Sequence, residues 1–257
     1  MKPINKLTKG ALLAAFLFII ATLAYTLIPS DYEKITNHVF DFISLVVVVT
    51  VLATAVKYNG KKSRQLNWIF IFLALLSWLV ADLIWTFYIY MGKDPFPSLS
   101  DIFYVIGNIL LFVAVFRKYL NVRKVASLRD NLNALFVFIV LLLVVSFTVL
   151  LPIIRSDSPL LDKFLLVFYP VSGMVTIFFA VILISAFGAG KERLAWFFVF
   201  AGVCVWTMAN TLFAYYDWNG IYTLAYNLVN LVYLAGLLFI GMGAYIRLLA
   251  LEGVDKS

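Results

Sequence analysis

The sequence predicts an all-α polytopic membrane protein with eight transmembrane helices, arranged as two parallel four-helix repeats. The chain is 64% hydrophobic and only 13% charged, with a mean hydropathy of +1.02, which excludes a soluble globular domain. Eight stretches are apolar over the roughly 20 residues that a helix needs to cross a bilayer. The second half of the chain also repeats a residue pattern of the first half, which indicates an internal duplication.

Each predicted element is a long apolar run. The strands of a transmembrane β-barrel would be shorter and would alternate apolar with polar residues, so these runs predict helices. In chain order the predicted spans are Lys9–Ile28, Thr36–Val56, Leu66–Met91, Ser98–Phe116, Leu132–Leu151, Phe164–Phe187, Leu194–Tyr216 and Ile221–Arg247. The first span is expected to stay uncleaved, because it is long enough to cross the membrane and no clear Ala-x-Ala site precedes Pro29.

The duplication is clearest in the third and fourth spans of each half. Asp101-x-x-Tyr104-x-x-Gly107 returns as Asn230-x-x-Tyr233-x-x-Gly236. The segment that opens with Gly60-Lys61-Lys62 and reaches Asp82 likewise matches the segment from Gly190-Lys191-Glu192 to Asn210. Because four spans are an even number, both halves insert in the same orientation, which gives parallel rather than inverted repeats. The predicted parts are a first repeat (1–120), a basic cytoplasmic linker (121–131), a second repeat (132–250) and a short cytoplasmic tail (251–257).

The basic residues predict the orientation, because Lys and Arg beside membrane spans are retained in the cytoplasm. With both termini cytoplasmic, 16 of the 20 basic residues lie on that side. The other side keeps only Lys34, Lys93, Arg155 and Lys163. We therefore predict a multi-pass protein of the cell membrane with both termini in the cytoplasm.

A basic patch lies between the two predicted repeats. It consists of Arg117, Lys118, Arg123, Lys124 and Arg129. Anionic lipids of the inner leaflet attract such a patch and are its expected partners. Contact with these lipids is sufficient to explain the net charge of +7. We therefore do not expect the protein to bind nucleic acid.

Few residues could hold a cofactor. The single cysteine, Cys204, excludes an internal disulfide and a cysteine metal cluster. The single histidine, His38, excludes a multi-histidine zinc site and bis-histidine haem ligation within the chain. The sequence therefore predicts neither a metal site nor another cofactor.

Polar residues within the predicted spans suggest a binding site, because a charge at membrane depth needs a partner or a cavity. Helical spacing puts Asp82 on one stripe between two tryptophans, and it puts Asp101 on a stripe with two polar residues. We expect a small polar and aromatic pocket on the outer side, between the third and fourth helices and roofed by the loop at residues 95–97. Its expected ligand-binding residues are Trp78, Asp82, Trp85, Asp101, Tyr104 and Asn108. Their counterparts in the second repeat are Trp206, Asn210, Asn230 and Tyr233.

Structural roles compete with ligand binding for each acid. Ser98-Leu99-Ser100-Asp101 before an apolar run fits a capping box, and Asp82 could form a structural hydrogen bond between helices. Asp41, three residues after His38, is expected in a hydrated network at the outer interface rather than in a catalytic dyad. If Asp82 and Asp101 both line the pocket, they are expected to approach one another.

The third and fourth spans resemble a known family. Ala81-Asp82-x-x-Trp85, followed by Pro97-Ser98 and then Asp101-x-x-Tyr104, is similar to the multi-helix membrane input region at the N-terminus of certain bacterial and archaeal signalling proteins. In that family a PAS, diguanylate cyclase or histidine kinase module follows the last helix. The sequence here ends at Ser257. The resemblance therefore implies either a stand-alone relative, which would need a separate signalling partner, or an input domain separated from its output.

Three functions remain open from the sequence. The first is a sensory or ligand-recognising membrane module that binds a small molecule or a lipid, which the resemblance and the predicted pocket favour. The second is a transporter or channel in which Asp82 and Asp101 bind a cation or relay protons. The third, which we favour least, is an intramembrane lipid hydrolase that uses the two acids as acid and base. A function other than enzymatic catalysis is thus expected.

Overall fold

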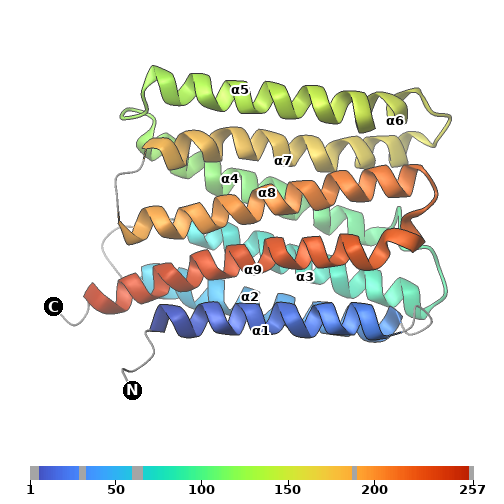
Figure 1. Ribbon diagram of the computed structural model, residues 1–257, viewed down its shortest axis with the longest axis horizontal. Helices are drawn as coiled ribbons and strands as arrows, with labels where there is room; N and C mark the ends of the chain where they lie inside the picture. Colours follow the sequence, from blue (N-terminus) through green and yellow to red (C-terminus); the bar gives the residue numbers. More distant parts are fainter. Residues whose placement is uncertain (1–5, 29–32, 60–65, 187–189, 255–257) are drawn as a thin grey trace.

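The protein is a bundle of long helices in the computed structural model, which describes residues 6–28, 33–59, 66–186 and 190–254 (Figure 1). All regular elements within these residues are helices. They are α1 (Lys6–Leu27), α2 (Glu33–Asn59), α3 (Asn67–Tyr90), α4 (Leu99–Val122), α5 (Leu128–Val145), η2 (Ser146–Leu150), α6 (Leu151–Arg155), α7 (Leu160–Ala186), α8 (Lys191–Trp218) and α9 (Tyr222–Val254). The π-helical η2 joins α5 to α6, so that residues 128–155 form one span.

Eight of these helical spans are long and apolar enough to cross a membrane. Their lipid-facing sides are also apolar. On α1, Leu12, Phe16 and Ile19 are more than half exposed, and on α5 Phe136 is 70% exposed. A soluble monomer rarely exposes an apolar surface of this extent. The protein is therefore an all-α integral membrane protein, as the sequence predicts.

Several helices extend beyond the predicted spans. Helix α4 continues to Val122, and α5 begins at Leu128, so much of the predicted linker is helical. Lys, Arg and Leu are good helix formers, and Ser127 starts α5 with a capping box completed by Asp130. Helix α9 likewise continues to Val254, into the predicted tail. Gly60-Lys61-Lys62 of the repeat pattern and residues 255–257 of the tail lie outside the described residues.

The helices run alternately up and down, and the start of α1 and the end of α9 lie at the same end of the bundle (Figure 1). We call this the terminal end, and we call the opposite end, with the turns at 91–98 and 219–221, the distal end. Which side of the membrane each end faces remains a prediction from the basic residues.

Contacts among the second, third and fourth helices of each half follow the predicted repeat. Helix α3 packs on α2 and α4 in the first half, and α8 packs on α7 and α9 in the second. The contact of α2 with α9 is matched by that of α4 with α7. This paired pattern is the one expected for two similar four-helix units related by an axis along the bundle.

Four tryptophans fill the centre between the two halves. The indoles of Trp78 and Trp206 are stacked with their ring centroids 3.8 Å apart and their planes 10° from parallel. Trp68 and Trp196 meet with their centroids 5.6 Å apart, nearer the terminal end. All four side chains are buried. The repeated tryptophans thus hold the two halves together at the axis between them.

An ion pair joins the halves near the terminal end. The Nζ atom of Lys118 on α4 lies 2.6 Å from Oε1 of Glu192 on α8, and Arg247 of α9 lies 3.8 Å from Oε2 of the same carboxylate. The Lys118 side chain is only 5% exposed. The expectation that Lys118 faces lipid headgroups is therefore wrong, because the bundle encloses it beside an acidic partner. Lipid binding by the other four residues of the basic patch remains a prediction.

Candidate functional site

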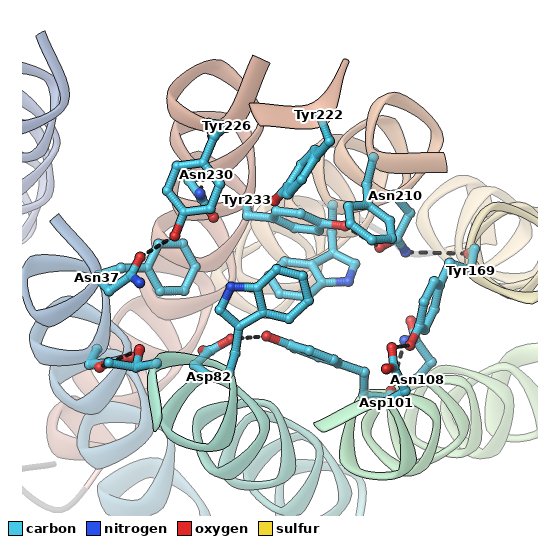
Figure 2. A pocket seen from close by; sticks show the side chains of 17 residues that line it. Asn37, Asp82, Asp101, Asn108, Tyr169, Asn210, Tyr222, Tyr226, Asn230 and Tyr233 are labelled. Carbon is cyan, nitrogen blue, oxygen red and sulfur yellow. Dashed lines mark hydrogen bonds between the residues drawn. The ribbon is translucent and has the colours of Figure 1, made fainter. Parts of the chain in front are cut away.

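A polar and aromatic cavity lies between the two halves, towards the distal end. Its volume is about 60 Å³, and its walls come from α2, α3, α4, α7, α8 and α9. The prediction placed the pocket between the third and fourth helices alone and therefore included too few helices. The paired contacts of α2 with α9 and of α4 with α7 bring four further helices around the cavity. Figure 2 shows side chains from these six helices pointing towards one another.

Asp82 is a buried acid in the cavity wall, with 8% of its surface exposed. Its Oδ1 atom accepts a hydrogen bond of 2.7 Å from the hydroxyl of Tyr104 on the neighbouring helix. Its Oδ2 atom is also buried, but it has no hydrogen-bond partner among the described residues. The predicted structural hydrogen bond between helices therefore exists, and it uses only one of the two carboxyl oxygens.

Asp101 combines a capping role with a contact between the two halves. Its Oδ2 atom accepts from the backbone N–H of Ser98 at 2.7 Å, completing the predicted capping box at the start of α4. Its Oδ1 atom accepts from the hydroxyl of Tyr169 on α7 at 2.5 Å. Asp82 and Asp101 line the same cavity, but each accepts from a different tyrosine (Figure 2). The cap confirms the structural alternative for Asp101.

The second half repeats the tyrosine contact with an amide in place of the acid. The hydroxyl of Tyr233 donates to Oδ1 of Asn210 at 2.9 Å, as that of Tyr104 donates to Asp82. The Nδ2 atom of Asn210 also donates to the backbone carbonyl of Tyr169 at 3.3 Å. The two halves therefore have equivalent hydrogen bonds, but the acceptor is a carboxyl group in the first half and an amide in the second. The cavity between them is therefore asymmetric.

The remaining predicted residues fall into two groups. Asn108 and Asn230 line the cavity, and each donates through Nδ2 to a backbone carbonyl of its own helix, at 2.9 and 3.0 Å. Trp85 and Trp206 also line it. Trp78 alone among the predicted residues is not in the lining. It stacks on Trp206 of the other half, so its role is packing.

The loop at residues 95–97, which was predicted to roof the pocket, contacts the cavity wall through the buried side chain of Phe96. Phe96 is 7% exposed and packs edge-on against Phe213, with the ring centroids 5.1 Å apart. Phe213 lines the cavity, whereas the loop residues at 95–97 do not. The loop therefore supports the wall from behind instead of covering the cavity directly.

Helices α2 and α7 contribute cavity residues that are absent from the predicted site. Asn37 and Asp41 of α2 and Tyr169 of α7 all line the cavity. The sequence does contain a pattern that could have indicated Asp41 and Tyr169, because Val39-Phe40-Asp41 aligns with Val167-Phe168-Tyr169. The spacing is the same 128 positions that separates Trp78 from Trp206. The repeat thus extends into the second helix of each half, where Asp41 in the first half corresponds to Tyr169 in the second.

A second hydrogen bond joins the halves at the cavity. The hydroxyl of Tyr226 on α9 donates to Oδ1 of Asn37 on α2 (Figure 2). This contact corresponds to that of Asp101 with Tyr169, because it joins the matching pair of helices. The cavity wall therefore contains two hydrogen bonds that cross between the halves, one on each side.

Asp41 lies where the cavity meets the exposed surface at the distal end. Its Oδ2 atom is 3.9 Å from Nδ1 of His38 and accepts a long hydrogen bond of 3.4 Å from Thr86. The His38 side chain is 58% exposed, and its Nε2 atom lies 2.7 Å from the hydroxyl of Tyr90. His38 itself does not line the cavity. These contacts form a polar network around Asp41, and its place at the membrane interface remains a prediction.

No protein-family model matches the sequence, and comparison with curated proteins and with solved structures gave no similar protein. The resemblance to membrane input regions of signalling proteins therefore remains a prediction from its motifs. Among the described residues, no group of three or more His, Cys, Asp or Glu side chains is placed to hold a metal ion. The chemistry of the site thus consists of carboxyl, amide and phenol groups in an aromatic wall.

Proposed function

We propose that the protein is a sensory membrane module that recognises a ligand in the cavity and responds by a change in packing between its two halves. The observation that carries this proposal is that hydrogen bonds between the halves lie in the cavity wall. They join Asp101 to Tyr169 and Asn37 to Tyr226. A ligand in this cavity contacts both halves and the bonds between them.

Binding can drive such a change only if the ligand prefers one arrangement of the halves. The cavity meets this condition, because a ligand that bonds to Tyr169 or Asn37 competes with a contact that exists in only one packing of α4 on α7 or of α2 on α9. The ion pair between Lys118 and Glu192 also crosses between the halves, at the terminal end. A shift between the halves would therefore also move the helices at the terminal end. A separate signalling partner bound at that end could detect this movement.

Recognition is favoured over transport by the packing below the cavity. A carrier must open its site to each side in turn, as alternating access requires. On the terminal side of the cavity the stacked pair Trp78 and Trp206 is followed by the pair Trp68 and Trp196, and all four are buried. Opening this path would require both aromatic pairs to separate.

The proposal is tested by combining thermal unfolding, inter-helix distances and flux. The purified protein in lipid nanodiscs is screened against small cations, anions and neutral polar compounds. Spin labels at Leu99→Cys and Leu160→Cys, in a Cys204→Ala background, report the distance between the distal ends of α4 and α7, because both sites are exposed. A stabilising compound is expected to change this distance, whereas the same compound should not be transported by proteoliposomes.

Three results would overturn the proposal. Transport of the stabilising compound would identify a carrier, and consumption of a lipid during incubation would identify an enzyme. A panel in which no compound changes either stability or distance would remove the evidence for recognition. Thr148→Val serves as the matched control, because Thr148 is exposed, lies outside the cavity and donates to the carbonyl of Val144 on its own span. This variant should respond as the wild type does.

A further inference from the structure

We infer that the ligand is a small amine, bound as a cation by Asp82, that also carries a hydroxyl or carbonyl oxygen. This inference rests on the proposed function of the cavity as a recognition site and names the chemistry of what it recognises. It follows from four features of the wall: its charge, one unused oxygen, its aromatic rings and two unused donors.

The first feature is the charge of the lining. Asp41, Asp82 and Asp101 contribute three carboxyl groups, and none of the described lining residues is Lys, Arg or His. The nearest base seen at these acids, His38, lies outside the lining and close to Asp41 only. A site walled by acids without a basic residue favours cations over anions.

The second feature identifies the acid that is available. Both oxygens of Asp101 accept hydrogen bonds, from Ser98 and Tyr169, and Asp41 has His38 and Thr86 beside it. Of these three acids, Asp82 alone has a buried oxygen without a partner among the described residues. A buried acceptor without a donor is costly, and a bond from an ionised ammonium to a carboxylate is among the strongest that such an oxygen can accept.

The third feature is the ring cluster beside Asp82. Trp85 lies three residues later on the same helix, and its ring meets those of Tyr104, Phe213 and Tyr222 at centroid distances of 6.2 to 6.4 Å. The planes cross at 69° to 84°, so the rings present faces in several directions. Aromatic faces attract cations, and more strongly away from water.

The fourth feature requires an acceptor on the ligand. The Nδ2 atom of Asn37 and the Nε1 atom of Trp206 are both buried, and neither has a partner in the part of the chain that the structure describes. Both residues line the cavity. They are donors, which an ammonium group cannot satisfy. A volume of about 60 Å³ holds roughly four water molecules. The ligand is therefore a short amino alcohol or an amine of similar size with a carbonyl, either free or as the headgroup of a lipid.

The test measures binding of ethanolamine to the full-length protein in lipid-free detergent, by calorimetry and by the thermal unfolding midpoint. Ethylamine supplies the cation alone, ethylene glycol the oxygen alone, and glycolate the opposite charge. We expect ethanolamine to bind most tightly, ethylamine at least threefold more weakly, and glycol, glycolate and sodium ions not at all. Nanodiscs with and without phosphatidylethanolamine distinguish the sources, because a lipid ligand would stabilise the protein only where that lipid is present.

The decisive variant is Asp82→Asn, which should weaken ethanolamine binding at least tenfold. It is expected to fold, because Asn210 already accepts the equivalent tyrosine bond in the second half. Asp157→Asn, an exposed acid outside the cavity, should bind as the wild type does. The exchange Asp82→Asn/Asn210→Asp keeps the composition and moves the carboxyl across the cavity, so it should recover part of the affinity.

The outcomes separate this inference from the proposed function. Binding of an anion or a neutral compound that survives Asp82→Asn would overturn the amine assignment and leave recognition intact. Sodium ions that stabilise the protein as well as ethanolamine does would also overturn it. If no compound of any charge binds, both proposals are wrong.

Discussion

A close approach between two helices predicts the effect of a single methyl group. Gly202 of α8 faces Gly236 of α9, and a Cβ atom at Gly202 would lie 2.7 Å from the carbonyl oxygen of Gly236. Ordinary contacts begin at 3.4 Å, so Gly202→Ala would have to move the helices apart by about 0.7 Å. The obstacle is backbone, which cannot rotate away as a side chain can. The first half has Ala74 at the corresponding position, so a methyl group is acceptable in α3 but not in α8.

The magnitude follows from two opposing terms. Overpacking of a well-packed contact costs about 2 kcal/mol, and alanine is better than glycine in a helix by about 1 kcal/mol. The expected net loss for Gly202→Ala is therefore about 1 kcal/mol. Gly241→Ala on α9 is the matched control, because the nearest neighbours of its Cβ atom would be side-chain atoms of Val47, with the two methyl groups at 3.1 Å. That side chain can adjust, so this variant should be at least as stable as the wild type.

The assay is reversible unfolding in mixed micelles, followed by far-ultraviolet circular dichroism over a series of SDS concentrations. Gly202→Ala should shift the midpoint to lower SDS, and Gly241→Ala should not. If Gly202→Ala were as stable as the wild type, or more stable, the close approach of α8 and α9 would not limit packing there, and the reasoning would be refuted.

Three further predictions use the same unfolding assay. Glu192→Gln should cost about 3 kcal/mol and more than Lys118→Met, because the Lys118 side chain is 5% exposed and that of Glu192 is 37% exposed; equal losses would contradict this order. A double-mutant cycle of Trp78→Phe and Trp206→Phe should give a coupling energy of about 1 kcal/mol, and additive losses would show that the stacked rings do not stabilise one another. Ser127→Ala should cost about 1 kcal/mol by removing the cap of α5, with faster amide exchange in the first turn of that helix; unchanged exchange would exclude the cap as its source.

Periodicity and hydropathy predicted the elements and much of the cavity. A helix repeats every 3.6 residues, so the spacing of Asp82 and Trp85, and of Asp101, Tyr104 and Asn108, put these side chains on common faces. Those faces do line one cavity. The capping box at Asp101 was also predicted correctly, because its signal lies within four consecutive residues.

Contacts between distant helices could not be predicted in the same way. Trp78 shares the stripe of Asp82, but the stacking partner that turns it into a packing residue, Trp206, is 128 positions away. Lys118 was assigned to the basic patch because the positive-inside rule considers only how near a basic residue lies to a span. The rule cannot show that folding brings the carboxylate of Glu192 beside Lys118. Tyr169 was overlooked because a tyrosine in an apolar span has no distinctive pattern until the hydroxyl is seen beside Asp101.

The stacked indoles have a spectroscopic consequence. At 3.8 Å and nearly parallel, the rings of Trp78 and Trp206 couple their near-ultraviolet transitions and should give an exciton couplet in circular dichroism. Each ring belongs to a different half of the protein. Any sliding or tilting of one half against the other changes the overlap of the rings, and therefore the sign or amplitude of the couplet. Circular dichroism of the unlabelled protein could therefore detect the motion between the halves that a signal through this bundle would require.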